Sequence, residues 1–158
     1  ILERLVAEDP ARVSWLNQLS FAHQALGELH LGQGRTAQAI ASYEKAVELV
    51  LQIVAITGDD PDPRNQVSWN RVMLGDAHAQ RGELDRAREL WTQAVEWLEP
   101  ITAVSDDVNY LDTYVQALLR LGRVDESRPL VEKMLARGWD DPKFLELLRR
   151  SGLSAELP

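Results

Sequence analysis

A set of residues that recurs after 48 positions restricts the folds open to this 158-residue chain. Repetition at a spacing of about 20 to 50 residues is typical of stacked supersecondary units, none of which can bury its own apolar face without a neighbour. The recurring residues are Leu26-Gly27, Gly34, Ala39, Tyr43 and Ala46 in the first copy and Leu74-Gly75, Gly82, Ala87, Trp91 and Ala94 in the second. The chain is therefore predicted to be a helical repeat array.

The residue types at these positions indicate that each copy is a pair of antiparallel helices. Gly27 and Gly75 lie within helical sequence, where a glycine costs roughly 1 kcal/mol relative to alanine, so their recurrence indicates a close helix contact. Ala39 and Ala46 stand seven residues apart, about two helical turns, with Tyr43 between them. A large ring beside two small side chains favours close packing of a second helix. Each copy is therefore predicted to be a helical hairpin.

The repeated residues resemble the motif of the tetratricopeptide repeat family. The resemblance includes His30 and Ile40 in the first unit and His78 in the second, and it extends to a more degenerate third unit. The corresponding residues of that unit are Leu111, Tyr114, Leu118, Leu121-Gly122, Ser127, Val131 and Met134. The usual repeat of the family has about 34 residues, and the excess here falls within the helices. The resemblance implies an all-α fold, a right-handed α-solenoid of tandem antiparallel helix hairpins with a short C-terminal capping helix.

The predicted organisation is one helical repeat domain over residues 1–158. Its parts are the tail of a preceding helix at 1–9, a first repeat at 11–57, a second at 64–104, a third at 106–137 and a capping helix at 141–152. We expect Thr36 to cap a helix, residues 58–63 to form a linker, and Pro100 to end or kink a helix. Because the start of the chain resembles the end of a repeat helix, the chain is expected to be a fragment of a larger protein.

Composition and charge restrict the classes of function. The chain has no cysteine, which excludes thiol catalysis, disulfides and thiolate metal sites. Its net charge of -8 opposes binding to nucleic acid and to anionic membranes, and no apolar run is long enough to cross a bilayer.

Similar elongated repeats occur in multidomain bacterial signalling proteins. The expected location is the cytoplasm.

The sequence lacks the residue patterns of catalytic and metal sites. Its histidines are His23, His30 and His78. Their spacing is not that of a metal site, and packing in the core is the favoured interpretation for the last two. Three aspartates near residue 60 lack the glutamate of a calcium loop, and no nucleophile elbow or phosphate-binding loop is found. The sequence therefore predicts a protein that is not an enzyme and needs no metal or other cofactor.

In the tetratricopeptide repeat family the first helix of each hairpin lines a concave groove, so the resemblance assigns a binding surface to this chain. The groove residues that it implies are Phe21, Gln24, Glu28, Leu31, Trp69, Val72, Asp76, Asn109, Asp112 and Gln116. The aromatic members would anchor apolar side chains, and the acidic members would favour a cationic partner. The alternative is that several of these residues pack between helices. The basic residues with which some family members hold carboxylate-ended tails are absent from these positions.

The leading functional hypothesis is a noncatalytic scaffold for protein–protein interaction, which binds a peptide or a partner domain in a groove of mixed apolar and acidic character. The partner is expected to be basic or amphipathic, and self-association through the solenoid ends is a further expectation. The alternative hypothesis is an intramolecular regulatory arm of a multidomain bacterial signalling enzyme, such as a kinase, peptidase or ATPase, whose catalytic domain lies N-terminal to this segment. Neither nucleic acid nor a membrane is expected as a partner.

Overall fold

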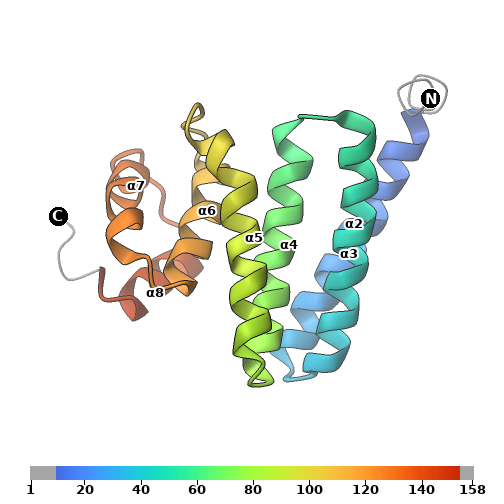
Figure 1. The fold of residues 1–158 in the computed structure, drawn as a ribbon, viewed down its shortest axis with the longest axis horizontal. Helices are drawn as coiled ribbons and strands as arrows, with labels where there is room; N and C mark the ends of the chain where they lie inside the picture. Colours follow the sequence, from blue (N-terminus) through green and yellow to red (C-terminus); the bar gives the residue numbers. More distant parts are fainter. Residues whose placement is uncertain (1–9, 154–158) are drawn as a thin grey trace.

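The computed structural model describes residues 10–153, and within that range the chain forms seven α-helices and no β-strand (Figure 1). The helices are α2 (Pro10–Gly32), α3 (Thr36–Thr57), α4 (Pro61–Gln80), α5 (Leu84–Thr102), α6 (Val108–Arg120), α7 (Val124–Ala136) and α8 (Pro142–Arg150). The predicted all-α fold is confirmed. The helix tail predicted at residues 1–9 lies outside the described residues.

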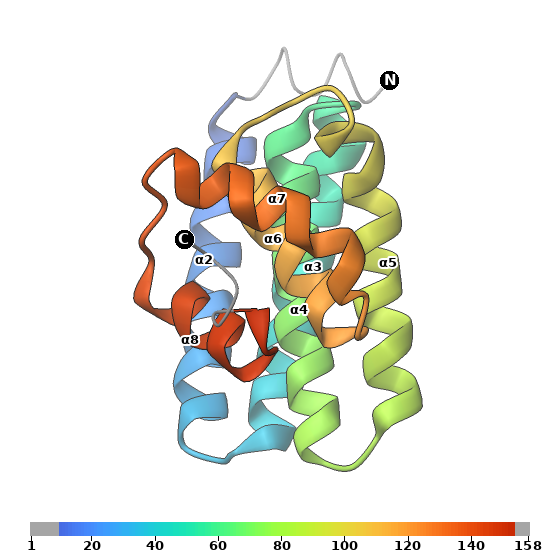
Figure 2. The same ribbon diagram turned by 90° about the vertical axis from the view of Figure 1, so that its left-hand side faces the viewer.

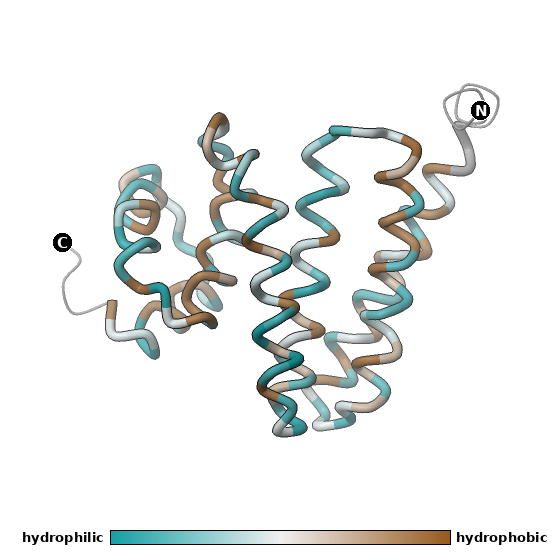
Figure 3. Tube along the Cα trace, in the orientation of Figure 1, coloured by the Kyte–Doolittle hydropathy of each residue, from teal (hydrophilic) through white to brown (hydrophobic). Residues whose placement is uncertain are grey.

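The helices are arranged as three antiparallel hairpins in a row, formed by α2 with α3, α4 with α5 and α6 with α7 (Figure 1). The first helices of the hairpins also contact one another, α2 with α4 and α4 with α6, and α8 packs against α6. These first helices therefore form an inner layer. Apolar and polar residues alternate along the helices, as expected where one side of each helix is buried (Figure 3). The arrangement agrees with the predicted α-solenoid.

The same tight turn joins the two helices of every hairpin. Its central residue is Gly34, Gly82 or Gly122, with φ of 71°, 82° and 74°, in the left-handed region that favours glycine. In each turn the residue after the glycine donates its backbone N–H to the carbonyl five residues earlier, at 2.8, 3.0 and 2.9 Å respectively. The third hairpin has the most degenerate sequence, yet it keeps the turn geometry of the first two.

Glycines within α2 and α4 allow an aromatic ring of the following helix to approach the backbone. A Cβ atom added to Gly27 would lie 2.8 Å from the Tyr43 ring. A Cβ atom added to Gly75 would lie 2.4 Å from Nε1 of Trp91. That nitrogen donates a hydrogen bond to the carbonyl of Val72 at 3.2 Å. The close helix contact predicted from the repeated glycines is therefore confirmed.

The prediction for the start of α3 is wrong. Thr36 is the first residue of α3 rather than its cap, and the capping position holds Arg35, whose side chain makes no capping hydrogen bond. For Pro100 the sequence left two alternatives, a helix end or a kink, and the structure contradicts the first, because α5 continues to Thr102. A proline so near the end of a helix removes one backbone hydrogen bond of the last turn, so the helix tolerates it there.

An aspartate caps each of the helices α4, α6 and α8. The side chain of Asp60 accepts a hydrogen bond from a backbone N–H in the first turn of α4, and Asp107 and Asp141 do the same for α6 and α8. Because Pro61 follows Asp60 as the first residue of α4, the helix begins three residues before the predicted start. The linker predicted at 58–63 is therefore shorter than expected.

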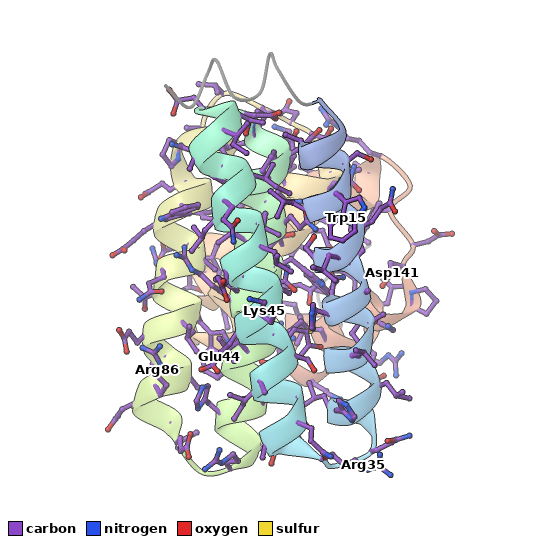
Figure 4. The ribbon with its side chains drawn as sticks, turned by 90° about the vertical axis from the view of Figure 1, so that its right-hand side faces the viewer. Trp15, Arg35, Glu44, Lys45, Arg86 and Asp141 are labelled. Atoms are coloured by element: carbon purple, nitrogen blue, oxygen red, sulfur yellow. The ribbon has the colours of Figure 1, made fainter. Side chains whose placement is uncertain are left out.

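One face of α2 is apolar and exposed at the N-terminal end of the described row. Trp15 is 72% exposed, and Leu19, Leu26 and Leu29 are 37%, 45% and 53% exposed; Figure 4 shows this side of the molecule. The equivalent residues of α4, 48 positions later, are buried: Pro63, Val67, Leu74 and Ala77. The exposed face is thus the counterpart of a surface that packs within the array in the second repeat. Self-association through this end stays a prediction.

Candidate functional site

Two adjoining hollows lie on the side of the array that the inner layer forms. The first, which we name the acidic hollow, has a volume of about 680 Å³ and lies beside the starts of α4 and α6. The second, the α8 hollow, has a volume of about 830 Å³ and is enclosed by α2, α4, α6 and α8. Figure 2 shows α8 in front of the inner layer. Trp69 and Asp112 line both hollows, so the two adjoin at these residues, and together we name them the groove.

Four carboxylates and no basic side chain line the acidic hollow. They belong to Asp60, Asp62, Asp107 and Asp112. Within residues 10–153 none of the four forms an ion pair. Asp60 and Asp107 accept backbone hydrogen bonds at the starts of α4 and α6, where the helix dipole stabilises negative charge. The lining of the hollow is therefore negatively charged and contains no basic side chain.

Aromatic rings lie among these carboxylates. Phe21 is 52% exposed, and Trp69 and Tyr110 are partly exposed. The Tyr110 hydroxyl donates a hydrogen bond to Oδ1 of Asp62 at 2.6 Å, which joins α6 to the start of α4. This hydrogen bond to a carboxylate, together with desolvation, raises the pKa of Tyr110 to about 12, so the tyrosine remains neutral. Ring surface beside unpaired negative charge suits a ligand that is cationic and partly apolar.

The α8 hollow contains a salt bridge between α4 and α6. The guanidinium of Arg120 donates to both carboxylate oxygens of Asp76, at 2.7 and 2.8 Å, and the two side chains are 16% and 25% exposed. Arg120 also donates to the backbone carbonyl of Gln116 at 3.0 Å. Asp76, which the sequence-based prediction included among the acidic groove residues that favour a cationic partner, is thus already bound by an arginine 44 residues away in the sequence.

Asp112 lies where the two hollows meet. Burial disfavours its charged form and raises its pKa from 3.8 to about 6, and the nearby charge of Asp141 acts in the same direction. Hydrogen bonds from the Gln116 amide to both carboxylate oxygens, at 3.1 and 3.2 Å, oppose this shift. The charge at the centre of the groove therefore depends on pH within the range from 5 to 7.

We expect Asp112→Asn to stabilise the protein at pH 7.5. In the folded state the pKa of Asp112 is about 6, above its ordinary 3.8, so folding favours the protonated carboxyl and the free energy of unfolding falls as pH rises from about 4 to 6. The asparagine variant avoids this penalty, which is worth about 2 kcal/mol. Urea unfolding at pH 7.5 and at pH 4 would measure it. The gain should vanish at pH 4, and an equal gain at both pH values would contradict the account.

Nine of the ten residues predicted for the groove line one or both hollows. The acidic hollow includes Phe21, Gln24 and Asn109; the α8 hollow includes Glu28, Leu31, Asp76 and Gln116; both include Trp69 and Asp112. Val72 is the exception, because it is 0% exposed and packs against α5 in a cluster with Trp91. On α4 the residue that follows Trp69 in the groove is Met73, one helical turn later.

The sequence-based prediction missed the residues that close the α8 hollow. Trp139, Lys143 and Leu147 come from the loop before α8 and from α8 itself. Their sequence predicts a terminal amphipathic helix but carries no signal that the helix lies over the groove. Tyr43 also lines this hollow, although it belongs to α3. The periodicity of α3 places Tyr43 in the core, and it lies at 0% exposure there, so its role in the groove floor could not be read from that pattern.

Neither metal ligands nor a membrane span are found in the part of the chain that the structure describes. No group of three or more histidine, cysteine, aspartate or glutamate residues there could hold a metal ion. His78 instead binds the carboxylate of Glu83 through Nδ1, at the turn between α4 and α5. No helix among the same residues has the length and apolar character needed to cross a bilayer.

Comparison with known protein families gives two matches. Residues 22–49 match a family model described as "Tetratricopeptide repeat", and residues 69–93 match a second model with the same description. The matched segments cover the junctions of α2 with α3 and of α4 with α5. No catalytic family is detected. Neither the curated proteins nor the solved structures gave a match.

Proposed function

We propose that this chain, which belongs to the tetratricopeptide repeat family, is a noncatalytic scaffold that captures a basic, partly apolar segment of another protein in its concave groove. The repeats of this family are generally protein–protein interaction modules. The main support is the acidic hollow, where four carboxylates and no basic residue surround exposed aromatic surface. A cationic segment gains charge complementarity there, and its apolar side chains gain contact with Phe21 and Trp69.

The distribution of charge along the groove favours the acidic hollow as the place where most of the partner's cations bind. In the α8 hollow the charge of Asp76 is already bound by Arg120, and the lining also contains Lys143 and Arg150. An acidic tail would meet repulsion in the acidic hollow. The proposed partner is therefore a segment in which lysine or arginine alternates with apolar residues, and its most basic part lies beside the starts of α4 and α6.

A fluorescent octapeptide of alternating leucine and lysine, acetylated at one end and amidated at the other, tests the proposal. Its fluorescence anisotropy should rise on titration with the protein, and the affinity should fall when the NaCl concentration increases from about 0.05 M to about 0.5 M. The matched peptide of leucine and glutamate should not bind. Binding of both peptides with equal affinity, or of neither, would contradict a cation-selective groove.

A pair of double variants shows whether the charge acts from the predicted place. Asp60→Asn with Asp107→Asn removes two charges from the acidic hollow and keeps both helix caps, because asparagine caps helices about as well as aspartate. Glu44→Gln with Glu96→Gln removes two charges from exposed positions outside both hollows. The first variant should bind the leucine–lysine peptide about tenfold more weakly, and the second should bind it as the parent protein does.

A further inference from the structure

Tyr43 brings a polar group from the outer layer of the array to the floor of the α8 hollow. Its ring packs over Gly27, where the absence of a side chain lets the phenol pass beside α2. The residue is 0% exposed and lines the α8 hollow, and its hydroxyl has no hydrogen-bond partner among the described residues. An unpaired buried hydroxyl is unfavourable, so a free protein that keeps one here carries an unfilled hydrogen-bonding site.

The corresponding ring of the second repeat differs in this respect. Trp91 stands 48 residues after Tyr43 and packs over Gly75 in the same manner, but its Nε1 donates to the carbonyl of Val72 at 3.2 Å. The polar group of the aromatic residue at this repeat position can therefore form a hydrogen bond within the fold. Of these two rings, the one that lines the α8 hollow, that of Tyr43, is also the one whose polar group has no partner.

The charges around the hydroxyl favour a cation as its partner. Burial raises the pKa of Tyr43, and the carboxylates of Glu28 and Asp76 raise it further, so the hydroxyl is neutral and faces two negative groups. Asp76 is paired with Arg120. The side chain of Glu28 receives only the amide of Gln24, at 3.2 Å, which leaves its negative charge without a cation in the described structure.

We propose that the α8 hollow contains a subsite for the ammonium group of a lysine carried by the partner segment. The carboxylate of Glu28 is its counter-ion and Oη of Tyr43 accepts one of its N–H groups, while Leu31 and Met73 contact the aliphatic part of the lysine side chain. A single hydroxyl and a single carboxylate suit a compact ammonium better than the planar fork of a guanidinium. The hydroxyl has almost no accessible surface in the free protein, so the proposal requires side chains at the floor of the hollow to move when the lysine binds.

A second unpaired group lies in the wall of the same hollow. Nε1 of Trp139 is buried and has no partner among the described residues, and an indole nitrogen can only donate. A peptide offers backbone carbonyls as acceptors for such a donor, which a simple inorganic cation does not. The two unpaired groups together therefore fit a lysine-containing peptide better than a metal ion.

This subsite rests on the proposed function, and the variant Tyr43→Phe separates the two. Loss of an unpaired buried hydroxyl should raise the melting temperature by about 3 °C, whereas the affinity for the leucine–lysine octapeptide should fall about tenfold. A hydroxyl with a purely structural role would not produce opposite changes in stability and binding. Glu28→Gln should weaken binding to a similar extent without the gain in stability.

Each outcome decides between the two proposals. If the octapeptide binds the parent protein and Tyr43→Phe binds it equally well, the subsite is wrong and the groove proposal stands. If Tyr43→Phe is destabilised as well as weaker in binding, the hydroxyl is structural and the subsite is again wrong. An octapeptide with arginine in place of lysine tests the choice of an ammonium group. If Tyr43→Phe lowers the affinity for this peptide by the same factor or more, that choice is wrong. If neither peptide binds the parent protein, both proposals fail.

Discussion

Gly75→Ala should lower the free energy of unfolding by about 2–3 kcal/mol, although the same substitution in an exposed helix stabilises by roughly 1 kcal/mol. The added Cβ would lie 2.4 Å from Nε1 and 2.7 Å from Cδ1 of Trp91. The ring must move, and its hydrogen bond to the carbonyl of Val72 is lost with the movement. Urea unfolding followed by circular dichroism would measure the effect.

Gly32→Ala is the matched control for this prediction. Gly32 is the last residue of α2, it has no positive φ, and a Cβ built there meets no atom within 4 Å. The free energy of unfolding of Gly32→Ala should equal that of the parent protein or be slightly higher. Gly27→Ala should be destabilised like Gly75→Ala, because its Cβ would lie 2.8 Å from the Tyr43 ring. If Gly75→Ala were as stable as Gly32→Ala, the close ring contact that defines the repeat would be wrong.

Trp69→Ala should weaken binding of the leucine–lysine octapeptide about 30-fold, or about 2 kcal/mol, without loss of helicity. Trp69 lines both hollows, so its ring is the largest apolar surface that the whole groove shares. Trp15→Ala removes an equally large ring that is 72% exposed on α2 and lines neither hollow. Fluorescence anisotropy should detect no change in affinity for that variant. Equal losses from both variants would indicate nonspecific adsorption of the peptide on exposed rings.

The helical hairpins could be predicted from the sequence because the signals that specify them are local and repeated. Gly27 with Tyr43, and Gly75 with Trp91, mark the close contact of two helices directly. The glycine of each hairpin turn requires a positive φ that few other residues adopt, so the turns could be placed even in the degenerate third unit. The start of α4 was misplaced because an aspartate followed by proline is found both in linkers and at the first turn of a helix.

The candidate site was predicted less well because its chemistry depends on pairs far apart in the sequence. The salt bridge of Asp76 with Arg120 changes an acidic groove position into a neutral one, and periodicity within a single helix contains no trace of it. The position of α8 over the groove depends on the path of the chain after α7, which no repeat specifies. Val72 and Met73 differ by one position on α4, and the hydrophobic pattern does not show which of the two faces the groove.

The five tryptophans offer the most direct measurement of where a basic segment binds. Their indole N–H groups give separate signals in a ¹H–¹⁵N NMR spectrum, and the positions differ: Trp69 and Trp139 line the groove, Trp91 is buried, and Trp15 and Trp97 line neither hollow. On titration with the leucine–lysine octapeptide, the signals of Trp69 and Trp139 should shift while those of Trp15 and Trp97 stay in place. Shifts at Trp15 or Trp97 with Trp69 unchanged would contradict recognition in the concave groove.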